Sequence, residues 1–281
     1  MKPQLDYSKL FDPIKDITTS VETLLDGAFG SLRGDQREQL KDIHRAAWGY
    51  HTLIMDIVTS LGMERIARRP ALRPRFDQYL QTIIARSGAL LKGVDGPITD
   101  EQRVSIDYIH SVGKRLQGYT PRLWLYSQLD QEIDLHPVTR CDLPTILQPL
   151  QMPIAAPPIA MEWMLPEQLP PVWACPTYAK LCLHELLTNA IAVTTQGAIQ
   201  VRAQENDQHV LVRVQDSGIG IKHDDLTAIT RPFYQIASAD GLGLGLHLVQ
   251  RLMTHQRGKF AIMSRPDEGT IAHVLFAKIS E

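Results

Sequence analysis

The sequence predicts an α + α/β protein, in which an N-terminal helical bundle of two tandem hairpins is followed by an α/β sandwich. Two observations lead to this prediction. The first 135 residues contain an internal repeat with apolar residues at helical spacing. The last hundred residues instead alternate strand-like and helical segments, with short glycine runs between them. The expected domains are residues 1–66, 67–135 and 136–281.

The repeated unit has the pattern of a helical hairpin. Leu24–Gly27 recurs 66 positions later as Leu90–Gly93, and Gly30 recurs as Gly96. On both sides of this glycine loop, apolar residues alternate steps of three and four, which is the seam of packed helices. In the first copy the seam contains Leu10, Ile14, Ile17, Val21, Leu24, Leu40, Ile43, Ala47, Tyr50, Ile54, Ile57 and Leu61. In the second it contains Ile106, Ile109, Leu116 and Leu123, with Gly113 and Thr120 as weaker positions.

A proline-rich segment separates the hairpins from the α/β region. Residues 137–171 hold nine of the eighteen prolines, so no long helix is expected there. We expect a hinge at residues 134–139, a short helix at 143–150 and a strand at 159–165. Farther along, residues 197–203 and 210–214 alternate apolar and polar side chains and predict an antiparallel hairpin of strands.

The predicted helix over residues 178–194 carries a carboxylate and an amide on one face. Glu185 and Asn189 are four residues apart and therefore neighbours on the helix surface. Mg²⁺ binds hard oxygen ligands and keeps several waters, so Asn189 could bind the metal while Glu185 orients or deprotonates a water. The alternative is an ordinary solvated helix face.

Two glycine-containing segments follow. Asp216 ends a predicted strand and precedes Gly218, Gly220 and Ile221, where a carboxylate could accept a hydrogen bond from the amine of adenine. The same letters also make an ordinary turn. The second segment, Gly241–Leu246, runs into a predicted helix at 244–253, whose N-terminus would face a phosphate. Its spacing fits neither a P-loop nor a dinucleotide fingerprint.

Together these segments resemble the N, G1 and G2 boxes of the ATPase superfamily that includes gyrase, heat-shock chaperones, mismatch-repair proteins and histidine kinases. The catalytic domain of histidine kinases, with its Bergerat-type fold, is the best match, over residues 137–281. Pro232–Tyr234 resembles its F box and Asp267–Thr270 its closing Gly-Thr box. The resemblance implies ATP and Mg²⁺ as cofactors, Glu185 as the catalytic carboxylate and Asn189 as the metal ligand. The implied nucleotide-binding residues are Asn189, Asp216, Gly218, Gly220, Ile221, Gly241, Leu242, Gly243, Leu244, Gly245, Leu246 and Thr270.

The chain also departs from the family pattern. Ala192 stands where many members carry a lysine, and the first glycine of the Gly-Thr box is missing. Between residues 222 and 240 the fixed positive charges are Lys222 and Arg231, and Arg231 is the better candidate for a contact to the γ-phosphate. An exposed surface arginine is the alternative interpretation.

The hairpins resemble the dimerisation and phosphotransfer domain of the same kinases, but without its acceptor histidine. In the family that histidine precedes a proline by five residues. Pro13 then places Ser8 at the acceptor position, and the repeat places Pro74 there in the second copy. His44 and His110 occupy equivalent points of the second helices, but a histidine beside a helical core is usually a packing or surface residue. Relocated acceptors are therefore the less favoured hypothesis.

In the family, two chains each contribute one hairpin to a four-helix bundle. Two hairpins in one chain could close that bundle alone, so we expect a monomeric pseudo-dimer. A true homodimer through one hairpin is the competing arrangement.

Composition excludes several classes of partner. The net charge of −2 gives no sign of a nucleic-acid or anionic-membrane partner. Cys141, Cys175 and Cys182 form no metal-binding pair and suit reduced, buried thiols. The sequence shows neither a membrane span nor a signal peptide, and a cytoplasmic location is expected.

Three functional hypotheses follow. In the first, the chain is a histidine-kinase-type enzyme that hydrolyses ATP or phosphorylates a partner. In the second, it is a pseudokinase whose bundle binds a response regulator or partner kinase under nucleotide control. The retained Glu185 favours the first, and Ala192 and the missing acceptor favour the second. A serine kinase of the anti-sigma type would not account for the tandem hairpins.

Overall fold

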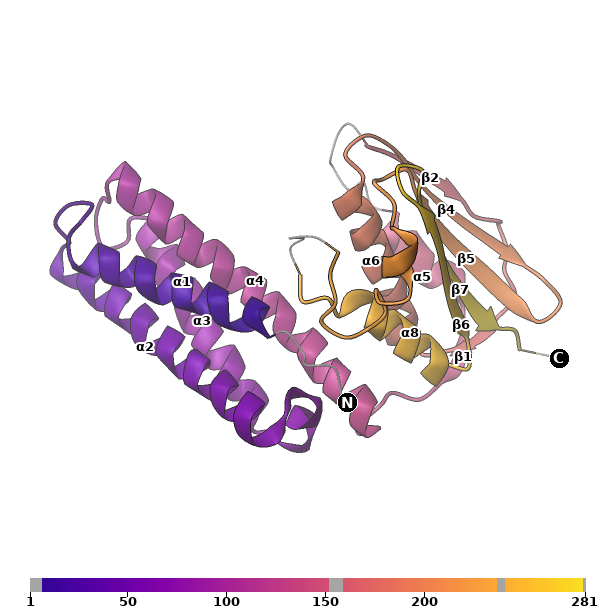
Figure 1. Cartoon of the computed structure of the whole chain (residues 1–281), viewed down its shortest axis with the longest axis horizontal. Coiled ribbons are helices and arrows are strands. Elements are labelled where there is room, and N and C mark those ends of the chain that lie inside the picture. Colours follow the sequence, from indigo (N-terminus) through magenta and orange to yellow (C-terminus); the bar gives the residue numbers. More distant parts are fainter. Residues whose placement is uncertain (1–6, 152–158, 237–240, 280–281) are drawn as a thin grey trace. The chain divides into compact units, whose positions relative to one another are not determined.

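The computed structural model describes residues 7–151, 159–236 and 241–279. The chain divides into two compact units, Met1–Ile133 and Asp134–Glu281 (Figure 1). The first is helical and the second is built on a sheet, which confirms the predicted fold class. Within the described residues, no helix is long and apolar enough to cross a membrane.

The first unit is a closed four-helix bundle. Its helices are α1 (Ser8–Leu25), α2 (Gly34–Asp56), α3 (Leu72–Leu91) and α4 (Asp100–Gln131). α1 packs against α2, α2 against α3, α3 against α4, and α4 against α1. Two sequential hairpins therefore bury their seams against each other within one chain.

The predicted seam forms the core of the bundle, with one exception. Every seam residue of α1 is fully buried, and so are the four strong and two weak positions of the second copy. Leu61 remains partly exposed. α2 ends at Asp56, and the widened π-helical turn η1 (Ile57–Leu61) rotates Leu61 away from the core direction. The prediction of a seam continuing to Leu61 was therefore wrong by one turn.

The connection between the hairpins packs on the second hairpin. After Gly62 the chain forms a 3₁₀ segment, η2 (Met63–Arg68), which contacts α4. The Ser127 hydroxyl accepts a hydrogen bond from the backbone N–H of Ala67 and donates one to the carbonyl of Glu64. The boundary expected after residue 66 falls inside this segment.

A reciprocal contact relates the two hairpins. Gln36 and Gln102, 66 positions apart, are each 2% exposed at the starts of α2 and α4. The Gln36 amide donates to the carbonyls of Gly96 (3.3 Å) and Pro97 (3.0 Å). The Gln102 amide donates to the carbonyl of Gly30 at 3.4 Å. Each glutamine therefore binds the glycine loop of the other hairpin. A two-fold symmetric dimer interface shows the same reciprocal pattern, and here it forms inside one chain.

The second unit contains a five-stranded mixed sheet in the order β2-β4-β5-β7-β6. The strands are β2 (Ile159–Met164), β4 (Gly197–Glu205), β5 (His209–Asp216), β6 (Lys259–Arg265) and β7 (Gly269–Ala277). β2 runs parallel to β4, and the other neighbours are antiparallel. The predicted hairpin is confirmed, with Val201 opposite Val214. A separate two-stranded sheet joins β1 (Thr139–Cys141) to β3 (Val172–Ala174).

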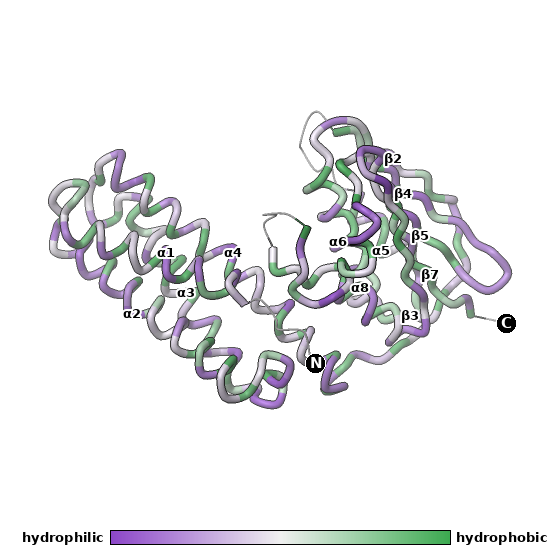
Figure 2. Tube along the Cα trace, viewed as in Figure 1, coloured by the Kyte–Doolittle hydropathy of each residue, from purple (hydrophilic) through white to green (hydrophobic). Residues whose placement is uncertain are grey.

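Helices cover one face of the large sheet. α6 (Pro176–Val193) and α8 (Gly245–His255) pack against each other and on the strands, and α5 (Leu143–Leu150) packs on α6 (Figure 1). Apolar and polar residues are interspersed along the strands (Figure 2). Buried and less buried residues alternate along β5, because successive side chains of a strand point to opposite faces of the sheet. The inward side chains include Ile199, Val201, Val212, Val214, Val274 and Phe276, all fully or almost fully buried. The strand ends and the helix starts nearest to them carry the residues considered next.

Candidate nucleotide-binding site

The carboxylate–amide pair of α6 lies against the start of α8. A methyl group built on Gly245 would lie 2.8 Å from Glu185 Oε2 and 3.6 Å from Asn189 Nδ2. A side chain at position 245 would therefore have to displace this carboxylate. Glu185 is 4% exposed, whereas Asn189 is exposed. Burial excludes the solvated-face interpretation for Glu185, and a buried carboxylate next to an exposed amide suits a cation–phosphate centre.

Asp216 ends β5 with its side chain buried, at 6% exposure. Its Oδ1 accepts hydrogen bonds from the backbone N–H groups of Gly218 (2.9 Å) and Thr270 (3.2 Å). Burial raises the pKa of the Asp216 carboxyl above its ordinary value, and these two hydrogen bonds oppose the rise. The carboxylate thus fixes the turn after β5 to the start of β7.

The turn that follows Asp216 is packed against backbone on two sides. A Cβ atom on Gly218 would lie 2.5 Å from the carbonyl oxygen of Val193, at the end of α6. Gly220 has φ +64°, and a Cβ atom there would collide with the carbonyl of Arg265. Both glycines are thus required by the geometry of the turn.

Ser264 anchors the end of the same turn and was missed in the sequence. Its hydroxyl accepts a hydrogen bond from the backbone N–H of Ile221 at 2.9 Å and lies 2.8 Å from the hydroxyl of Thr270. The predicted residues Asp216, Gly218, Ile221 and Thr270 therefore belong to one hydrogen-bonded cluster. Only the pairing of β6 with β7 brings Ser264 to it, and no sequence motif marks a serine in that place.

The glycine-rich segment before α8 presents backbone rather than side chains. Leu242 and Leu244 are buried at 4% and 1% exposure, and Leu246 is half-buried. Gly243 has φ +66°, and its carbonyl accepts a hydrogen bond from the N–H of Phe233 at 3.0 Å. Because the side chains of Leu242 and Leu244 are buried, these residues could contact a ligand only through their backbone. Gly241 precedes them in the loop.

The segment before this loop is short and partly helical. α7 (His223–Leu226) is followed by turns, and the Tyr234 hydroxyl donates to Asp225 Oδ1 at 2.6 Å. Lys222 and Arg231 are both exposed. Residues 237–240, part of the segment 222–240 examined for positive charges in the sequence, lie outside the described residues. Among the described residues, no group of three or more His, Cys, Asp or Glu side chains could hold a metal ion, so a cation here would need phosphate and water oxygens as further ligands.

The fold and the site together define a class of protein. A mixed sheet covered on one face by helices, a carboxylate–amide helix, an Asp-led turn and a glycine-rich helix start occur together in the ATPase domains named above. The family model described as "Histidine kinase-, DNA gyrase B-, and HSP90-like ATPase" matches residues 176–279. This part of the chain is therefore an ATPase domain of the histidine-kinase family.

Similar proteins support this assignment. Sporulation kinase E of Bacillus subtilis is 30% identical over 119 residues, which are 41% of this chain and 16% of that protein. The sensor histidine kinase RppB of Synechocystis is 26% identical over 202 residues, 68% of this chain and 44% of that protein. The chain thus spans less than half of the length of either relative. The solved structure of full-length ShkA in complex with AMPPNP has a TM-score of 0.63 at 22% identity, over 77% of this chain and 47% of that one.

The raised pKa of Asp216 predicts a particular pH dependence of stability. A carboxyl whose pKa is higher in the folded state stabilises the fold only when protonated, and this contribution is lost as pH rises from the unfolded to the folded pKa. In nucleotide-free protein, the Asp216→Asn variant should therefore gain stability relative to the wild type as pH rises toward neutral. Urea unfolding from acid to neutral pH measures the difference. The exposed-site control Asp207→Asn should show no such trend, and a flat difference for Asp216→Asn would contradict the prediction.

Proposed function

We propose that the chain is an ATP–Mg²⁺-binding signalling protein of the two-component type, which acts on or through a partner protein such as a response regulator or partner kinase. The observation that carries the proposal is the placement of buried Glu185 and exposed Asn189 against the Gly245 start of α8. This placement occurs on an ATPase domain of the histidine-kinase family. Relatives named as a sporulation kinase and a sensor histidine kinase support the signalling role.

Adenine recognition is assigned to Asp216. Both backbone hydrogen bonds to this side chain end on Oδ1. Its Oδ2 then accepts a hydrogen bond from the exocyclic amine of adenine, and the ligand offsets part of the cost of burying the charge. Gly218 and Gly220 allow the backbone to approach the base closely.

The phosphate groups are assigned to the start of α8. The free N–H groups of its first turn and the positive end of the helix dipole favour an anion there, and the backbone from Gly241 to Leu246 lines the approach. Bound Mg²⁺ would neutralise phosphate charge. Asn189 would bind it through its amide oxygen, and Glu185 would orient or deprotonate the attacking group. Arg231 is the candidate for a contact to the γ-phosphate.

A pseudokinase is the second candidate function. Ala192 offers no cation to phosphate, and Ser8 and Pro74 at the expected acceptor positions cannot form a phosphoimidazole. In this version the nucleotide controls a partner-binding bundle without being consumed. The buried Glu185 favours turnover, and the experiment on this residue below separates the two functions.

Nucleotide binding tests the site directly. Titration calorimetry should detect ATP binding by the wild type, and Asp216→Asn should weaken it about tenfold to a hundredfold, the value of one hydrogen bond to a charged group. Asn189→Ala should abolish the gain in affinity on adding Mg²⁺ while leaving metal-free binding unchanged. Asp207→Asn, on an exposed turn, is the control. A wild type that binds no ATP would overturn the proposal.

Turnover tests the enzyme against the pseudokinase. With γ-labelled ATP and candidate response regulators, the wild type should release phosphate or transfer label. Glu185→Gln should lower that rate by about 10² to 10⁴, as for loss of a general base, with ATP affinity retained. Glu167→Gln, an exposed carboxylate, is the matched control. Tight ATP binding without any turnover would favour the pseudokinase.

The chain is further proposed to be a monomer that closes its own bundle. The reciprocal contacts of Gln36 and Gln102 use within one chain the surfaces that a second copy would need. Light scattering should therefore give a mass near 31.6 kDa, unchanged on dilution. A stable mass of twice that value would contradict the pseudo-dimer.

A further inference from the structure

The large sheet of the second unit has one face that the described helices of this unit leave open. α6 and α8 pack on the other face, toward which the buried side chains of Val201, Val214 and Ala272 point (Figure 1). The residues between these positions point away from the helices, because successive side chains of a strand alternate. Met164 of β2 and Met263 of β6 lie on this side and are 41% and 53% exposed. We call this side of the sheet the open face.

A row of basic residues crosses the middle of the open face. Arg202 of β4 lies directly opposite Arg213 of β5, and Arg213 lies opposite His273 of β7. We call these three residues the basic row. Like charges directly opposite each other on neighbouring strands destabilise a sheet. The basic row therefore lowers the stability of the free domain, and its placement suggests a role other than holding the sheet together.

No carboxylate of the described residues neutralises the two arginines. Arg202 donates to the side-chain oxygen of Gln200 at 3.4 Å, and Arg213 donates to that of Gln215. Both acceptors are uncharged amides. The Nε–H of Arg213 is buried and has no hydrogen-bond partner among the described residues. Burial, and to a smaller extent the charge of Arg213, lowers the pKa of His273 below its ordinary value. A carboxylate would be stabilised in these surroundings.

The open face as a whole is basic, although the chain has a net charge of −2. Its one acidic strand residue is Glu162, on the edge strand β2, and the Glu162 carboxylate accepts a hydrogen bond from the amide of Gln200 at 2.7 Å. Against it stand the fixed cations of three strands, which are Arg202, Arg213, Lys259 and Arg265. Of these cations, Arg265 has a carboxylate within reach, that of Glu268 at 3.4 Å. Positive charge is thus concentrated on one side of a domain that is not basic overall.

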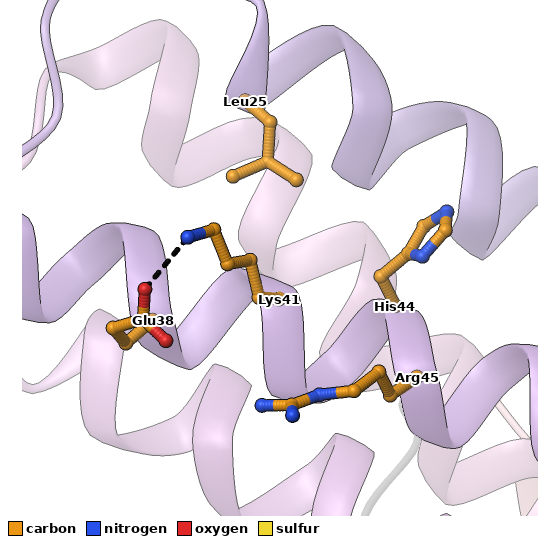
Figure 3. A pocket seen from close by; sticks show the side chains of 5 residues that line it. All are labelled: Leu25, Glu38, Lys41, His44 and Arg45. Carbon is orange, nitrogen blue, oxygen red and sulfur yellow. Dashed lines mark hydrogen bonds and ion pairs between the residues drawn. The ribbon is translucent and has the colours of Figure 1, made fainter.

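Basic side chains on the bundle show the opposite arrangement. A hollow on the first hairpin is lined by Leu25, Glu38, Lys41, His44 and Arg45 (Figure 3). Each basic side chain of this hollow lies beside a carboxylate, namely Lys41 beside Glu38, Arg45 beside Asp42 and His44 beside Glu22. Such paired charges leave little field for a ligand. The arginines of the basic row keep theirs.

Apolar side chains flank the basic row on both sides. Leu211 lies opposite Leu275 on one side of the row, and Ile271 lies opposite Met263 on the other. These side chains are partly or fully exposed. Each flanking pair is two residues, about 7 Å, away from the basic row. An α-helix is about 10 Å wide, so a helix lying along the row would touch both flanking pairs.

We propose that the open face binds a partner protein through an acidic amphipathic helix, whose carboxylates contact the basic row and whose apolar side chains cover the flanking pairs. Neighbouring strands are about 4.8 Å apart, and carboxylates one turn apart on a helix are separated by about 5.4 Å. Successive carboxylates can therefore reach successive strands. Arginine binds a carboxylate through two parallel hydrogen bonds, and the unpartnered Nε–H of Arg213 is available for one of them.

A protein segment fits this surface better than a nucleic acid does. Bases that bind a sheet usually stack on aromatic rings. The described strand residues of the open face include no Phe, Tyr or Trp, because Trp163, Phe260 and Phe276 point to the helix-covered side. The open face contains none of the nucleotide-site residues, so the proposal does not depend on ATP binding.

A panel of synthetic helical peptides tests the surface. Each peptide carries Glu at alternating steps of three and four between leucines, the positions of the leucines vary across the panel, and each has a counterpart with Gln for every Glu. Fluorescence anisotropy of the labelled peptides measures binding to the full chain. At least one acidic peptide should bind, and its Gln counterpart should bind about a hundredfold more weakly, the value of two charge-assisted contacts.

Variants locate the bound peptide. Arg202→Gln and Arg213→Gln should each weaken binding about tenfold, the value of one such contact. Lys180→Gln removes an exposed cation of α6 and should leave binding unchanged. The double variant Arg202→Glu/Arg213→Glu should bind a version of the peptide with Lys in place of Glu. The comparison of Glu and Gln peptides on the wild type does not depend on the folding of any variant.

Three results would overturn the proposal. The first is a panel in which no acidic peptide binds more tightly than its Gln counterpart. The second is binding that neither arginine substitution weakens. The third is a panel that fails while a single-stranded oligonucleotide, or vesicles containing phosphatidylserine, bind in a way that depends on Arg213. That result would assign the open face to a nucleic acid or a membrane surface instead of a protein.

Discussion

One carboxylate oxygen holds the candidate nucleotide site in shape. Oδ1 of Asp216 accepts hydrogen bonds from the N–H group of Gly218, in the turn after β5, and from the N–H group of Thr270, which lies 54 residues after Asp216 near the start of β7. The turn around Gly220, the Ser264 hydroxyl network and the approach to α6 all follow from that junction. A buried charge at such a point is costly unless every partner is in place. A ligand that completes the hydrogen bonding of the Asp216 carboxylate would offset this cost, which favours binding.

The bundle depends on a different kind of constraint, the equivalence of its two halves. Gln36 and Gln102 each cap their own helix and bind the loop of the other hairpin, so both loops must keep the same backbone shape. The φ angles of Gly30 and Gly96, +106° and +100°, show that they do. Away from these contacts the copies are free to differ: His44 pairs with the carboxylate of Glu22, whereas His110 contacts the Ser87 hydroxyl and the carbonyl of Ile84.

Much of the fold could be predicted because its signals are local and periodic. The apolar seam identified α1 and α2, and alternation identified β4 and β5, since both patterns reflect burial of one face. The end of α2 could not be predicted, because the π-turn before Gly62 keeps apolar residues at nearly helical spacing. In the site, motif residues on one segment, such as Glu185 and Asn189, could be found from their spacing. Ser264 could not, because its role arises only when β6 pairs with β7.

Joining the two hairpins in one chain changes how the stability of the bundle depends on protein concentration. In a two-chain bundle the folded assembly weakens on dilution and can exchange subunits with related chains, because association is bimolecular. In the proposed monomer the short connection through η1 and η2 makes the pairing of the hairpins intramolecular, so its stability would be independent of concentration and each half would always meet the same neighbour. A substitution also changes one face only, instead of appearing twice by symmetry. Such a scaffold can keep one face for structure while the other acquires a separate chemistry.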